Sequence, residues 1–218
     1  QKSDSLKLNL SGIRIRDIMD MVAFDDVEFD GIATGTVTIS DFFGTPAVNT
    51  SLKVTDFKFN NAPMGYMNLI GTWNNELKQI DLEANINENE GNTGIKGFIN
   101  TAQNTIDLHF NAEKTNALFL NKFLPEAVQF KQGRTTGKLQ LHGKLNAMNL
   151  KGTQTLSNAT IYIDPLGTTY TMDGNIIDLY TDTINFKSFK LIDKYGNQAN
   201  MTGNVTHKAL HDFRYDLN

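Results

Sequence analysis

The chain has 218 residues, of which 39% are hydrophobic and 20% are charged, a composition typical of a globular protein. Its 24 acidic and 20 basic residues give a formal net charge of −4, and the basic residues form no cluster that would attract a phosphate backbone, which argues against nucleic acid as a partner. The lack of cysteine excludes disulfides, thiolate metal sites and cysteine nucleophiles. No apolar run approaches the roughly 18 residues of a membrane span. We therefore expect no membrane span in this chain and expect any targeting signal to lie outside it.

The dominant sequence pattern is alternation of apolar and polar residues with a period of two. Because successive side chains of a strand point to opposite faces, each alternating segment predicts a strand with one apolar and one polar face. In chain order these segments are 6–10, 36–39, 80–83, 106–110, 138–141, 161–163 and 213–217. Turn-forming residues separate them, as at 43–46 and 195–197. Short strands joined by such turns predict an all-β fold with an antiparallel sheet.

Two segments interrupt the alternation and predict short helices. They are residues 16–22 and 115–124. In the second segment Asn116 is a suitable N-cap, and Leu120, Phe123 and Leu124 would share one face of the helix. Pro125 would end that helix, because a residue before proline avoids the helical region.

The segments that follow the two helices correspond to each other at an offset of 102 residues. Gly35 corresponds to Gly137 at this offset, and the turn 62–65 corresponds to 164–167. Apolar positions also step by three from Val54 to Phe57 and from Leu156 to Ala159, which predicts a β-bulge at the same place in each copy. The pattern predicts two tandem repeats that form an elongated, curled sheet. Their boundaries would be 13–112 and 113–218, with 1–12 as the last strand of a preceding repeat.

The search for chemically active groups predicts neither a catalytic site nor a metal or cofactor site. His109 and His142 fall on the polar phase of strands, which predicts exposure to solvent. His207 and His211 have the spacing of helical metal ligands but lie where a turn into the last strand is expected. The segment 87–92 carries oxygen ligands without the full spacing of a calcium loop, so we expect a hairpin turn there.

The second repeat resembles a known family in its glycine spacing and strand pattern. The resemblance rests on Gly133, Gly137 and Gly143, on the run 161–167, and on the closing stretch 191–207. These features resemble the repeat region of TamB (translocation and assembly module) proteins, within the wider AsmA-like family, in the form found in Bacteroidetes. The resemblance covers most of residues 125–218 and, more loosely, 23–112.

This resemblance implies a non-enzymatic periplasmic protein that an N-terminal helix outside these residues anchors in the inner membrane. It also implies a long sheet curled into a trough with an apolar interior, which carries phospholipid towards the outer membrane. An outer-membrane barrel protein of the Omp85 type is the implied partner, and the family is further linked to outer-membrane biogenesis and protein secretion. The family's C-terminal end is expected to lie outside this chain.

An apolar stripe along such a trough is physically suited to acyl chains. Burial contributes about 0.8 kcal/mol per CH₂, so a 16-carbon chain gains on the order of 10 kcal/mol when it leaves water. A row of similar aliphatic and aromatic side chains would also let a lipid slide along the stripe. The predicted lining residues are Leu8, Val37, Ile39, Phe57, Phe59, Leu82, Leu108, Phe110, Leu139, Leu141, Ile161, Ile163, Ile184, Phe186, Phe213 and Tyr215.

Two other functions are compatible with the sequence. The chain could be a scaffold that assists the assembly of outer-membrane β-barrel proteins by adding strands through its open edges. It could also be a β-sandwich that binds glycans, in which case exposed aromatic residues such as Tyr66 and Trp73 would cluster on a polar face.

Overall fold

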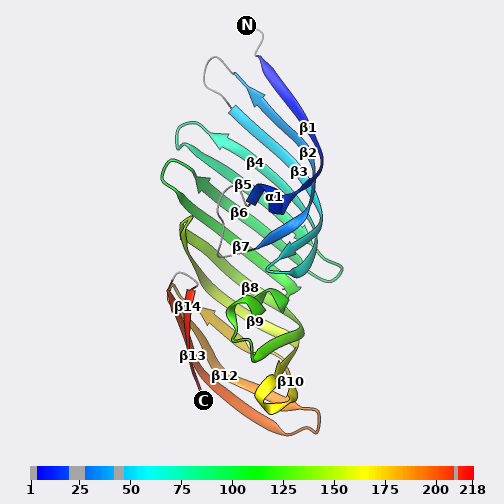
Figure 1. Ribbon diagram of the computed structural model, residues 1–218, viewed down its shortest axis with the longest axis vertical. Coiled ribbons are helices and arrows are strands. Elements are labelled where there is room, and N and C mark those ends of the chain that lie inside the picture. Colours follow the sequence, from blue (N-terminus) through cyan, green and yellow to red (C-terminus); the bar gives the residue numbers. More distant parts are fainter. Residues whose placement is uncertain (1–3, 20–27, 42–46, 209–210) are drawn as a thin grey trace.

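The computed structural model describes residues 4–19, 28–41, 47–208 and 211–218, and within them fourteen strands form one antiparallel sheet (Figure 1). Strands that follow one another in the sequence are neighbours in the sheet almost throughout, so the sheet grows steadily from the N-terminal to the C-terminal strand. The long axis of the molecule therefore runs across the strands (Figure 1). The prediction of an all-β fold with an elongated, curled antiparallel sheet is confirmed.

The strands that follow the two predicted helices form two comparable series. The first series, with the strand before it, consists of β1 (Ser5–Arg14), β2 (Phe29–Ser40), β3 (Ala47–Phe59), β4 (Ala62–Asn74), β5 (Gln79–Asn87), β6 (Asn92–Asn100) and β7 (Thr105–Asn116). The second consists of β8 (Val128–Lys144), β9 (Ala147–Ile163), β10 (Thr168–Met172), β11 (Ile176–Leu179), β12 (Thr183–Asp193), β13 (Gln198–Lys208) and β14 (His211–Leu217).

One strand position in the second series is divided into two short strands. Both β10 and β11 pair with β9 on one side and with β12 on the other, and residues 173–175 separate them. The corresponding strand of the first series, β4, is continuous over 13 residues. A 3₁₀ helix, η2 (Asp164–Leu166), precedes β10, and Gly167 ends it in the left-handed conformation.

Bulges recur across the sheet. The register shifts between Val54 and Phe57 in β3, and again within 157–160 of β9, as predicted. Similar shifts occur in β1, β7 and β12. At each bulge one residue has a positive φ, and these residues are Gly12, Asp56, Lys114, Asn158 and Ser188. Because a bulge bends its strand and increases the twist, bulges on strands that run in the same direction favour a curled sheet.

The two short helices form where expected, with differences in length and type. Helix α1 (Ile15–Met19) follows β1 and packs against β2; the remainder of the predicted helix, residues 20–22, lies outside the described residues. The second segment forms a 3₁₀ helix, η1 (Ala117–Phe123). Asn116 is its N-cap, as predicted, and Leu120 and Phe123 are buried together while Leu124 is half-buried at the C-cap.

Candidate functional site: an apolar trough occupied by a short helix

The inner face of the sheet carries most of the predicted lining residues. Directly paired residues of neighbouring strands point to the same face. One row of pairs begins with Leu8 and Val37 and continues across the sheet through Leu82, Leu108 and Leu141. These five residues therefore face the same side of the sheet.

A second row of pairs, next to the first, reaches the C-terminal strands. It joins Phe110 and Leu139 to Ile184 and Tyr215. Three further predicted residues lie two positions along a strand from a member of these rows and share its face: Ile39, Phe186 and Phe213. Beyond the bulges, the remaining four belong to the same hydrophobic core or pack against it: Phe57, Phe59, Ile161 and Ile163.

The predicted lining residues differ in how far they are covered. Six are buried, eight are half-buried, and two are exposed. The exposed ones are Leu8 (42%) and Tyr215 (41%), which lie on the first and last strands of the sheet. The apolar face is therefore accessible at both ends of the sheet and covered in its middle.

A small cavity lies in the covered middle of the trough. Its volume is about 70 Å³ and its walls are almost wholly apolar. Five of the predicted residues line it: Phe57, Phe59, Phe110, Leu139 and Leu141. Three further phenylalanines complete the aromatic wall and were not predicted: Phe29, Phe119 and Phe123.

Helix η1 lies inside the trough and covers this cavity, and the sequence pattern did not predict that position. The Phe119 ring lies 5.5 Å from the Phe59 ring of β3, measured between centroids. The Phe123 ring lies 6.4 Å from the Phe213 ring of β14. Figure 1 shows η1 across β8 and β9. The two ring contacts join η1 to strands from both halves of the chain.

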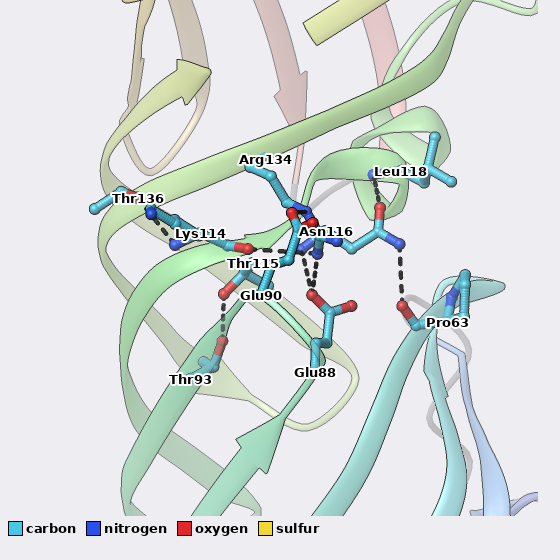
Figure 2. A network of polar contacts seen from close by, with 10 residues as sticks. All are labelled: Pro63, Glu88, Glu90, Thr93, Lys114, Thr115, Asn116, Leu118, Arg134 and Thr136. Atoms are coloured by element: carbon cyan, nitrogen blue, oxygen red, sulfur yellow. Dashed lines mark hydrogen bonds and ion pairs between the residues drawn. The ribbon is translucent and has the colours of Figure 1, made fainter. Parts of the chain in front are cut away.

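Polar contacts fix the N-terminal end of η1 (Figure 2). The Asn116 side-chain oxygen accepts a hydrogen bond from the Leu118 amide at 3.0 Å, and its side-chain nitrogen donates to the Pro63 carbonyl at 3.0 Å. The Asn116 amide donates to a Glu88 carboxylate oxygen at 3.2 Å. One residue thus caps η1 and ties it to the hairpins β3–β4 and β5–β6.

The Glu88 carboxylate is also paired with the Arg134 guanidinium, as Figure 2 shows. A carboxylate oxygen of Glu90 lies 3.7 Å from the Arg134 Nε atom. The Glu88 side chain is only 10% exposed, and this burial raises its pKa because it penalises the charged carboxylate more than Arg134 and the Asn116 amide favour it. The segment 87–92 is a hairpin turn, as expected, and its acidic residues hold Arg134.

Two pairs of buried polar residues interrupt the apolar interior, and alternation alone did not identify them. The Thr93 and Thr115 hydroxyls are hydrogen-bonded to each other, and the Thr135 hydroxyl donates to the Gln154 side-chain oxygen at 2.7 Å. Each pair joins neighbouring strands, so these polar groups are buried with partners.

Two of the histidines lie on the outer face of the sheet, because His109 and His142 follow the inward-facing Leu108 and Leu141. His109 is exposed, as expected. His142 is half-buried instead: burial lowers its pKa, and its Nε2 atom is buried with no hydrogen-bond partner among the described residues. His207 differs: it lies within β13, not in a turn, and its side chain is 6% exposed with its ring 5.7 Å from the Phe213 ring. The side chain of His211 lies outside the described part of the chain. In that described part, no group of three or more histidine, aspartate or glutamate residues could hold a metal ion.

The arrangement of Tyr66 and Trp73 does not fit a glycan-binding β-sandwich. Both residues lie on β4, seven positions apart, in a stretch that pairs with β5 without a register shift. They therefore point to opposite faces of one sheet, and no shared polar face presents them together. The described strands also form a single sheet.

Among the described residues, none of the helices has the length and apolar character of a membrane span.

Comparison with known proteins supports one family. No curated protein and no solved structure gives a significant match. The model of the TamB C-terminal domain matches residues 82–190, from β5 to β12. The match identifies residues 82–190 with the family's C-terminal domain, and the expectation that the family's C-terminal end lies outside this chain stays a prediction. This match covers half of the chain, and the chain belongs to the TamB family.

Proposed function

We propose that this chain is a non-enzymatic, periplasmic part of a TamB-like protein that provides an apolar trough for phospholipid transport between the inner and outer membranes. The observation that supports it most directly is the inner face of the sheet. Twelve of the sixteen residues chosen from the sequence point to that face between β1 and β14, and the other four belong to the hydrophobic core or pack against it. Acyl chains would bind along the half-buried and exposed members of this set, where burial of each CH₂ contributes about 0.8 kcal/mol.

The family assignment and the backbone both support the wider setting. A TamB-like protein would be anchored in the inner membrane through a segment outside these residues and would work with an Omp85-type barrel protein. The chain would then be part of a tandem array. In support, the pairs Gly35/Gly137, Asp56/Asn158 and Gly65/Gly167, each 102 positions apart, all have positive φ. The repeat boundaries and the Bacteroidetes type remain predictions.

A charge placed on the inner face tests the proposal. Val37 is half-buried on the inner face, and Thr38 beside it points to the outer face. We expect Val37→Asp to reduce binding of a fluorescent phospholipid at least fivefold, because a carboxylate in the trough would have to be desolvated by the acyl chain. Thr38→Asp is the matched control and should bind as the original chain does. Circular dichroism would establish that both variants are folded; equal binding by both would contradict the proposal.

The alternative, a scaffold for β-barrel assembly, would act through backbone pairing at the outer strands β1 and β14. Its effect would depend on the strand edges and not on the inner face. Val37→Asp would then leave client assembly unchanged, whereas proline at an edge position of β1 such as Lys7 would reduce it.

A further inference from the structure

We propose that η1 is a movable plug, and that the alkyl chain of a lipid takes its place in the trough when it is displaced. This inference rests on the proposed function and adds a step to it. A lipid that moves along the inner face from the first strands to the last must pass the position that η1 occupies.

The buried residues of η1 resemble a ligand in their chemistry. Ala117, Phe119, Leu120 and Phe123 are all buried, and none carries a polar side-chain group. They pack against the phenylalanines of β3 and β14 and cover a cavity with apolar walls. An alkyl chain in the same position would restore the apolar contacts that are lost when η1 moves away, so displacement need not expose the interior to water.

The polar contacts that hold η1 are few and lie at its ends. Asn116 fixes the start of the helix through the Pro63 carbonyl and Glu88. Near the other end, the Asn121 amide group exchanges two hydrogen bonds with the Phe130 backbone. Displacement of η1 about its N-terminal attachment would therefore have to break the two Asn121 hydrogen bonds.

One ion pair connects η1 to the opposite part of the sheet. The Lys122 ammonium lies 3.2 Å from a Glu28 carboxylate oxygen, and 94 positions separate the two residues in the sequence. Their side chains are 40% and 47% exposed. An exposed ion pair contributes little to stability, so it can hold the closed position and still break readily.

The absence of cysteine makes a direct test possible. In the variant Glu28→Cys/Lys122→Cys the two introduced thiols are the only ones, and a cleavable bis-maleimide would link η1 to the residue before β2. The control is Glu83→Cys/Lys96→Cys, which replaces an ion pair of 2.9 Å between β5 and β6 on the outer face. The probe is dansyl-undecanoic acid, whose fluorescence rises when its alkyl chain is bound in an apolar site.

We expect the link at 28/122 to slow or weaken probe binding at least tenfold, and cleavage of the link to restore it. The linked control should bind as the original chain does. A second variant tests the same step without a link: Phe123→Ala removes a plug contact and should bind the probe more tightly than the original chain.

The outcomes separate the plug from the proposed function. Equal binding with the 28/122 link intact and cleaved would overturn the plug and leave the trough function standing. Failure of every form to bind the probe, the original chain included, would overturn both. Weaker binding by Phe123→Ala, with the fold intact by circular dichroism, would show that η1 forms part of the binding site and would also overturn the plug.

Discussion

Gly137 lies in β8 with φ +155°, and a Cβ added to it would be 2.1 Å from the Thr153 carbonyl oxygen of β9. Gly35, 102 positions earlier, has φ +157° and the same close approach to the Ser51 carbonyl oxygen. These glycines let two backbones approach each other where the sheet bends, so any side chain at either position requires the strands to separate.

Replacement of Gly137 by alanine is therefore expected to be costly. We expect Gly137→Ala to lower the free energy of unfolding by roughly 2–4 kcal/mol, through backbone strain and displacement of β9. Gly94→Ala is the control, because an added Cβ there meets no atom within 4 Å, and its effect should stay within about 0.5 kcal/mol. Urea denaturation of the three proteins measures the difference; similar midpoints for both variants would contradict this explanation of the close approach.

The Glu88–Arg134 pair makes the free energy of unfolding depend on pH. Burial raises the pKa of Glu88 above 4.5, and Arg134 opposes that rise. In Arg134→Met the pKa of Glu88 should rise further, so the variant loses stability as the pH rises through the pKa that Glu88 has in the folded original chain. Well below that pKa the Glu88 carboxyl is protonated in both folded proteins, and the charge-dependent part of the loss disappears.

We expect Arg134→Met to cost about 1–3 kcal/mol at pH 7 and clearly less at pH 4. The double variant Glu88→Gln/Arg134→Met removes the buried charge and should show little of this pH dependence. Chemical denaturation at the two pH values tests both statements, and a loss that is the same at pH 4 and pH 7 would contradict them.

Helix η1 shows what the local sequence can and cannot predict. The helix and its cap follow from neighbouring residues, because Asn116 accepts the Leu118 amide two positions away. The position of η1 inside the trough depends on contacts between Phe59 and Phe119 and between Phe123 and Phe213, which lie 60 and 90 positions apart. No local pattern encodes such pairs, so the position of η1 in the trough could not be predicted from the sequence.

The cap is expected to stabilise η1 in two separable ways. Asn116→Ala removes both the cap and the hydrogen bond to Pro63, and we expect a loss of about 1–2 kcal/mol. Asn116→Ser keeps a capping oxygen without the amide donor and should fall between alanine and the original residue. Thermal unfolding followed by circular dichroism orders the three proteins, and a serine variant no better than alanine would argue against the cap.

The position and facing of the strands could be predicted better than those of the helices, because alternation directly reflects the two faces of the sheet. The step of three at 54–57 located a bulge, since an extra residue changes the phase of the alternation. The buried Thr135 and Gln154 were missed because polar residues at inward positions carry no such signal and are satisfied only by each other. The sequence predicts a turn at His207 and misses its burial, because that burial beside Phe213 depends on how β14 packs.

A single sheet with one apolar face has to cover that face without the help of a second sheet. Curling brings the inner faces of distant strands towards η1, which contacts β3 on one side and β14 on the other. The interior is therefore closed in the middle, while Leu8 and Tyr215 are exposed at the two ends. This pattern is what a conduit with an occupied centre would show, and it distinguishes the chain from a β-sandwich.

Binding of lipid by the inner face can be tested most directly by chemical detection of the bound lipid. The purified chain would be extracted with organic solvent and analysed by mass spectrometry, beside a β-sandwich protein of similar size purified in the same way. We expect phospholipid at close to one molecule per chain and well above the control. Phospholipid at the level of the control would contradict lipid binding by the inner face and favour the scaffold alternative.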